Sequence, residues 1–305
     1  MNVMTPFRNP SPLRRSPEGS AAGAAAPAAL RDGGFRDLVV HAGGDAGAPA
    51  RLAFAARFAR RQGAHLVAVN ALVEPTLPPS VRALAGTALM DTMREHVRDA
   101  ATGVRKAVEA AGKAEGVAIE YREAWGAPID IALLHARHAD ATIVSQPDRR
   151  APGAAGLLAE QLVMEAGRPV LIVPGAGDYA GEARHVVCAW NGTREAARAM
   201  ADALPVLRKA AKVTILSIDP PGAATRLPGA DIALHLARHG VAAEASTTYA
   251  DGMGVGDALL SRLADLGADM LVMGAYGHSR AREAVFGGAT RDVLDRMTVP
   301  VLMSH

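Results

Sequence analysis

The chain has 305 residues, half of which are hydrophobic, and it carries a formal net charge of +2 at pH 7. This length and hydrophobic content favour two compact domains over one. Because basic and acidic residues are interspersed along the chain, and because no run approaches the roughly 18 apolar residues that cross a bilayer, we expect neither a nucleic-acid surface nor a membrane span.

Residues 1–34 differ from the rest of the chain. They hold five prolines among Ala, Gly and Ser and have almost no periodic apolar pattern, which predicts a disordered tail. A targeting signal is an alternative, but Gly23 and Pro27 interrupt the alanine-rich stretch and no leucine-rich core is present. The single cysteine, Cys188, lies in an apolar run and is expected to be a small buried side chain. A cytoplasmic location fits these features.

After the tail, short apolar runs alternate with amphipathic segments. This alternation predicts α/β domains in which a parallel sheet is covered by helices on both faces. The predicted strands of the first half are 36–42, 65–71, 117–124, 141–145 and 169–173, with helices at 48–62, 80–112, 128–138 and 155–166. Those of the second half are 184–190, 212–218, 241–248, 269–274 and 299–303, with helices at 193–209, 228–239, 254–266 and 288–297.

The second half of the chain repeats the first. Three apolar strands correspond in sequence and in order, namely 37–42 with 184–189, 139–144 with 268–273, and 168–173 with 299–303. Repetition on this scale indicates a duplicated domain rather than a short solenoid repeat. We therefore expect two domains of one fold in tandem, at 35–174 and 183–305, with a Pro- and Gly-containing boundary between them.

A split glycine motif follows the fourth predicted strand of the second half. Gly274 and Gly277 come directly after the strand, whereas Gly287, Gly288 and Thr290 stand at the start of the last helix. Glycine lets main-chain N–H groups approach an anion, and a helix N-terminus offers unpaired donors, so the motif favours phosphate binding. In such sheets, ligands bind at the carboxyl ends of the strands.

The same positions also have a purely structural interpretation. Gly274 and Gly277 can serve a tight turn, and the glycine pair before the last helix can allow close packing of that helix. Asn191 can head a turn in which Thr193 is the helix N-cap. Both interpretations stay open from the sequence alone.

The second half resembles the universal stress protein family from Val186 to Leu302, through its first strand, the split glycine motif and the closing Val-Pro-Val strand. The first half looks like a diverged copy, so the chain resembles the tandem, two-domain members found in bacteria. The resemblance implies two five-stranded parallel α/β domains that pack as an intramolecular pseudo-dimer, with their closing strands paired. Whether a further homo-oligomer forms stays open.

The resemblance also implies a ligand. In ATP-binding members, an acidic residue after the first strand lies by the adenosine, and the glycine motif cradles ribose and phosphates. Here that acidic position is Asn191, which can form hydrogen bonds but lacks the charge. Gly274, Gly277 and Gly287 match the three glycines, whereas Gly288 replaces the expected Ser or Thr, and Thr290 offers a hydroxyl nearby. One site for ATP with Mg²⁺, or for another adenine nucleotide, is the expectation.

The first half departs further from the motif. Ser145 and Asp148 stand where the second half has Gly274 and Gly277, and Pro147 lies between them. Proline removes a donor and aspartate repels phosphate. We therefore expect no ATP site of the family type in this half, which instead provides a surface for the other domain.

These features predict a stress-response regulatory protein that binds an adenine nucleotide without fast turnover. The alternative is an interaction module that binds no nucleotide and acts through protein partners. No Walker lysine and no nucleophile elbow occur, and His278 lacks an assignable carboxylate, so we expect no catalytic residue, with slow ATP hydrolysis as a third option.

Arg280 and Arg282 can pair with phosphate. Two groups have metal-like spacing but are expected to bind none: Asp231, His235 and His239, and His135 with His138.

Overall fold

The computed structural model describes residues 33–148, 156–219, 228–277 and 288–305. The first half contains β1 (Asp37–His41), α1 (Ala48–Gln62), β2 (His65–Leu72), α2 (Pro79–Glu115), β3 (Ile119–Trp125), α3 (Pro128–Ala136), β4 (Ala141–Ser145), α4 (Leu158–Glu165) and β5 (Val170–Val173). The second half contains β6 (His185–Ala189), α5 (Arg194–Leu207), β7 (Lys212–Ile218), α6 (Ala230–Arg238), β8 (Ala243–Thr248), α7 (Val255–Asp265), β9 (Met270–Gly274), α9 (Ala289–Arg296) and β10 (Val301–Ser304). Every predicted strand and helix has a counterpart among them.

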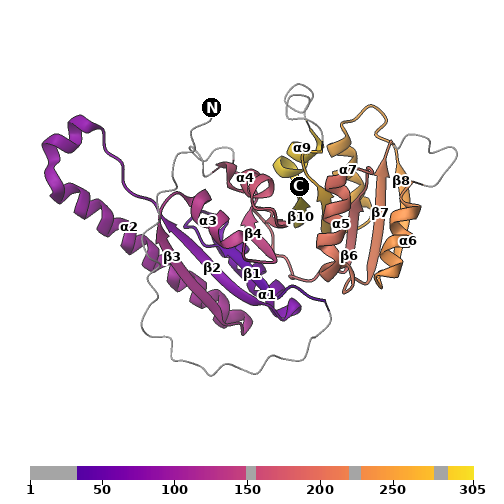
Figure 1. Cartoon of the computed structure of the whole chain (residues 1–305), viewed down its shortest axis with the longest axis horizontal. Coiled ribbons are helices and arrows are strands. Elements are labelled where there is room, and N and C mark those ends of the chain that lie inside the picture. Colours follow the sequence, from indigo (N-terminus) through magenta and orange to yellow (C-terminus); the bar gives the residue numbers. More distant parts are fainter. Residues whose placement is uncertain (1–32, 149–155, 220–227, 278–287) are drawn as a thin grey trace, which may run out of the picture.

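All ten of these strands form one sheet, in the order β3-β2-β1-β4-β5-β10-β9-β6-β7-β8 (Figure 1). Neighbouring strands run parallel within each half, and the pairing of β5 with β10 is antiparallel. The expected tandem α/β domains and their pseudo-dimeric packing are therefore confirmed. Because the strands of the two halves run in opposite directions, their carboxyl ends lie at opposite ends of the strand axis.

Helices cover both faces of the sheet, as the pattern of fully apolar strands predicts. On one face, α1, α2, α5 and α6 contribute buried residues to a shared core: Leu52, Val108, Met200 and Leu236. On the other face, α3, α4, α7 and α9 do the same: Ala132, Leu162, Leu259 and Val293. Both cores contain residues of both halves, so the domains share their two hydrophobic layers. Cys188 is fully buried in the first of them, as expected.

The closing strands join the halves. In the antiparallel pair, Leu302 lies opposite Leu171, flanked by Val301 opposite Ile172 and by Met303 opposite Val170. All six side chains are fully buried. An unpaired sheet edge exposes N–H and C=O groups that attract other chains, and this pairing covers one such edge of each half.

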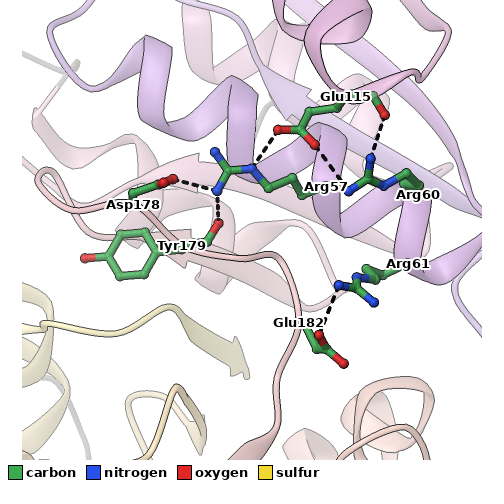
Figure 2. Close-up of polar contacts among 7 residues, drawn as sticks. All are labelled: Arg57, Arg60, Arg61, Glu115, Asp178, Tyr179 and Glu182. Carbon is green, nitrogen blue, oxygen red and sulfur yellow. Dashed lines mark hydrogen bonds and ion pairs between the residues drawn. The ribbon is translucent and has the colours of Figure 1, made fainter.

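The linker between the halves is fastened to α1 by ion pairs (Figure 2). Arg57 Nε donates to Glu115 Oε1 at 2.8 Å, and its Nη1 donates at 2.5 Å both to Asp178 Oδ1 and to the carbonyl oxygen of Tyr179. Two further ion pairs run along the same helix: Arg60 with Glu115, and Arg61 with Glu182. Arg57 thus connects α1, the end of α2 and the linker.

Tyr179 extends this connection to the second half. Its hydroxyl lies 2.6 Å from the carbonyl oxygen of Ala176 in the linker and 3.2 Å from that of Thr298, just before β10, so it is within hydrogen-bond distance of both. Its ring lies edge-on to the ring of Phe54 in α1, with centroids 6.5 Å apart. The linker therefore contacts both halves instead of hanging between them.

The shared core at the β5–β10 pair should dominate stability. Replacing the fully buried Leu302 by alanine is expected to lower the free energy of unfolding by about 2–5 kcal/mol, because transfer energy is lost and a cavity remains. Urea unfolding followed by circular dichroism measures this. Leu234→Ala is the matched control, since that side chain is 55% exposed and its loss should cost less than about 0.5 kcal/mol. Equal effects of the two substitutions would contradict a central role for the strand pair.

Candidate functional site

A cavity of about 490 Å³ opens at the carboxyl ends of β6, β7 and β9 in the second half. Its lining includes five of the six residues that the sequence singled out: Asn191, Gly274, Gly277, Gly288 and Thr290. The sixth, Gly287, lies outside the described residues, as do His278, Arg280 and Arg282. The structure therefore gathers the described part of the predicted site around one cavity.

Two helices begin at this cavity. The N-cap residues of α7 and α9 are Gly254 and Gly288, and neither has a side chain to accept hydrogen bonds from the first-turn N–H groups. Such helix ends present donors and a partial positive charge to an anion. Asp257 and Asp292 in these first turns both pair with Arg296, the latter at 3.2 Å, so one positive charge offsets part of their negative charge.

The rest of the cavity wall is mainly apolar. It is formed by side chains at the ends of β6, β7 and β9 and at the start of α7: Ala189, Trp190, Leu216, Ile218, Met253, Val255, Leu259 and Met273. An apolar wall beside two helix N-termini suits a ligand with a flat, weakly polar part and an anionic part.

Asn191 forms the turn that the structural interpretation predicted. Its Oδ1 accepts hydrogen bonds from the N–H of Thr193 at 3.2 Å and from the Thr193 hydroxyl at 2.9 Å. Thr193 Oγ1 in turn accepts from the N–H of Ala196 at 3.3 Å and is the N-cap of α5. Because Oδ1 already accepts two hydrogen bonds within the turn, the group of this amide that is left for a ligand is Nδ2, which acts as a donor.

The glycines after β9 let the following loop lie against the first turn of α5. A Cβ on Gly274 would lie 2.5 Å from the carbonyl carbon of Glu195, a distance that real Cβ atoms do not show. A Cβ on Gly277 would lie 3.1 Å from Glu195 Oε2. Thr290 is 4% exposed, and its hydroxyl oxygen accepts from the N–H of Tyr276 at 3.2 Å, which ties α9 to the same loop. Gly274 thus has a packing role whether or not a ligand binds.

Glu195, which packs against the cavity-lining Gly277, is a residue beside this site that the sequence reasoning missed. It lies in the first turn of α5, is 4% exposed, and accepts a hydrogen bond from Arg194 Nε. Burial raises the pKa of this carboxyl, but hydrogen bonds from Arg194 and from its own N–H, with the charge of Arg194, outweigh burial and leave the pKa lowered. A buried, ionised carboxylate therefore lies beneath the glycine loop. An acidic residue two positions after a threonine N-cap was the available signal.

The sequence model of the Universal stress protein family matches residues 34–174 and 182–305. The chain belongs to this family. No curated protein matches the chain.

Solved universal stress proteins have the same fold. One from Archaeoglobus fulgidus is 16% identical over 87% of this chain and 95% of its own, with a TM-score of 0.66. A putative universal stress protein from Pseudomonas aeruginosa is 16% identical over 88% and 93%, with a TM-score of 0.52. A one-domain universal stress protein in complex with cAMP is 20% identical, covers 47% of this chain and all of its own, and has a TM-score of 0.37.

The first half of this universal stress protein has an internal ion pair at the corresponding edge. Arg51 of α1 is 1% exposed, and its Nε donates to the carbonyl oxygen of His41 at 2.7 Å. Its guanidinium pairs with Asp45 at 2.8 Å and donates to the hydroxyl of Ser145, at the end of β4. In this half the side chain of Arg51 connects the first loop to the end of the fourth strand.

Metal-binding and membrane-spanning features can be assessed for the described residues. Among them, no group of three or more His, Cys, Asp or Glu side chains is arranged to hold a metal ion. His235 and His239 lie on α6 with ring centroids 4.7 Å apart, and the buried His135 has its Nδ1 2.9 Å from the carbonyl oxygen of Ile131. Within the same part of the chain, no helix has the length and apolar character needed to cross a membrane.

Removal of the buried guanidinium should destabilise the first half. In Arg51→Met the carbonyl oxygen of His41 and the hydroxyl of Ser145 lose a charged donor, whereas the carboxylate of Asp45 is 46% exposed and stays hydrated, so we expect the free energy of unfolding to fall by about 1–3 kcal/mol. The control is Arg61→Met, because Arg61 is 49% exposed and surface ion pairs contribute less than about 1 kcal/mol. Urea unfolding of both variants tests this, and a loss no larger than that of the control would show that the buried guanidinium is not stabilising.

His41 should make stability depend on pH. Burial, followed by the nearby charge of Arg51, lowers the pKa of His41 to about 4, although Asp45 acts in the opposite direction. Between pH 6.5 and about 4 the unfolded chain binds a proton that the folded chain does not, so the free energy of unfolding should fall as the pH is lowered, by roughly 3 kcal/mol. His41→Gln should reduce this slope in urea unfolding measured at several pH values. An unchanged slope would contradict a neutral His41 in the folded chain.

Proposed function

We propose that this universal stress protein is a stress-response regulatory protein that binds ATP, with Mg²⁺, or another adenine nucleotide in its second domain. We place the protein in the cytoplasm and the two domains at 35–174 and 183–305. The observation that carries the proposal is the cavity at the ends of β6, β7 and β9, where Asn191 and the described glycine-motif residues meet two glycine-capped helix N-termini.

The two parts of the cavity match the two parts of a nucleotide. The apolar wall around Trp190, Leu216 and Ile218 offers contact surface for a base, and the starts of α7 and α9 offer N–H donors for an anionic group. A volume of about 490 Å³ lies within the range of sites for small molecules.

Slow or absent turnover is part of the proposal. Among the described residues that line the cavity, none has an ionisable side chain, so none can act there as a general acid or base. A ligand held in this way can be sensed without being consumed, which suits regulation better than metabolism.

A second candidate function is a protein-interaction module without a nucleotide. Two observations favour it: Gly274 is required by packing alone, and Asn191 uses its carbonyl oxygen to form the turn before α5. Calorimetry with Mg-ATP, AMP and adenosine, together with analysis of any nucleotide that copurifies, distinguishes the two functions. Absence of both binding heat and copurified nucleotide would favour the interaction module.

A charge placed at the mouth of the cavity should weaken nucleotide binding. Val255 lines the cavity and is 48% exposed, so Val255→Glu brings a negative charge to the site without disturbing the core. We expect Mg-ATP affinity to fall roughly tenfold, since like charges at this range repel by one or two kcal/mol. The control is Leu234→Glu, which changes an exposed apolar residue on α6 outside the cavity lining. Equal affinities of the two variants would place the nucleotide elsewhere.

A further inference from the structure

The carboxylate of Glu195 lies directly beneath the loop that follows β9. The position of a Cβ on Gly277 would be 3.1 Å from Glu195 Oε2 and 3.4 Å from the hydroxyl oxygen of Thr193. The Glu195 side chain is about 5% exposed, and it is held by Arg194, whose own side chain is 85% exposed. The negative charge is therefore fixed in place on the inner side of the loop, while its cationic partner is largely in solvent.

This charge bears directly on how a phosphate chain can bind. An anionic group held at the start of α9 lies in the cavity that Gly277 also lines, and Gly277 is the point at which the loop packs against the carboxylate, so the two negative charges repel each other. The cost grows with the number of negative charges on the ligand. It is absent for an uncharged nucleoside, and it is reduced when a divalent cation accompanies the phosphates.

The carboxylate cannot easily move away from this position. Gly274 brings the loop within contact of the backbone at Glu195, and Thr290 holds the loop to α9 through the N–H of Tyr276. Movement of the carboxylate would also break its hydrogen bond with Arg194.

We infer that Glu195 is a specificity-determining residue that selects against free polyphosphates. The site then takes an adenine nucleoside or a nucleoside monophosphate more tightly than free ATP, and takes the triphosphate chiefly as its Mg²⁺ complex. This inference rests on the proposed function, because it concerns the same cavity.

The test compares adenosine, AMP and ATP by calorimetry, in EDTA and in Mg²⁺, with the full chain. For the wild type we expect tighter binding of adenosine and AMP than of ATP in EDTA. Glu195→Gln keeps the size of the side chain and removes its charge, so the affinity for ATP in EDTA should rise roughly tenfold while that for adenosine stays within about twofold. The increase in ATP affinity on replacing EDTA by Mg²⁺ should be smaller in this variant than in the wild type.

Two further variants complete the test. Glu244→Gln makes the same change at an exposed position on β8. It should alter neither the affinity for ATP relative to that for adenosine nor the increase in ATP affinity that Mg²⁺ gives. Arg194→Gln removes a largely exposed partner of the carboxylate, leaves the fold intact, and should weaken ATP binding further without changing adenosine binding.

The outcomes separate the inference from the proposed function. If adenosine binds and Glu195→Gln leaves the ratio of ATP to adenosine affinity unchanged, the nucleotide site stands and the selective role of Glu195 is wrong. If a folded Glu195→Gln variant gains affinity for adenosine and ATP alike, the residue acts by packing and the inference is also wrong. If the wild type binds none of the three ligands, the proposed function fails and the inference with it.

Discussion

The antiparallel pairing of β5 with β10 is the contact on which the arrangement of this molecule depends. It turns two five-stranded sheets into one, so that each hydrophobic layer continues from the first half into the second. Because the pairing is antiparallel, the carboxyl ends of the strands in one half point in the opposite direction to those in the other half. One direct consequence is that the C-terminal end of α9, whose N-terminus lies at the cavity, meets the first half, where Gln146 Nε2 donates to the carbonyl oxygen of Leu294 at 2.8 Å.

Near the carboxyl ends of their strands, the two halves bury side chains of opposite charge at corresponding places. In both, the turn after the first strand must approach the end of the fourth strand. The first half fills this place with the cation of Arg51, balanced by Asp45, whereas the second half uses small residues at Gly274 and Gly277 and buries the anion of Glu195. The cavity described above lies in the second half, at the carboxyl ends of β6, β7 and β9.

The order and type of the strands and helices could be predicted because apolar runs and amphipathic segments depend on local sequence. The pairing of the closing strands could be predicted because two apolar edges need cover. The site was harder to predict from the sequence. The sequence places Asn191 and the glycines near one edge, but whether an amide faces a ligand or its own turn depends on hydrogen bonds across three residues. Burial of Glu195 and Arg51 depends on how loops from separate strands meet, which no local pattern records.

The linker, fastened by Arg57 and Tyr179, has a consequence for assembly and for divergence. When two edge strands belong to one chain, their association is unimolecular, so it persists at any dilution, unlike the pairing of separate subunits. Covalent fusion also releases the halves from symmetry. The two chains of a homodimer have the same sequence, so every residue occurs at both sites, whereas this chain has a cavity at the strand ends of its second half and a buried guanidinium at those of its first half.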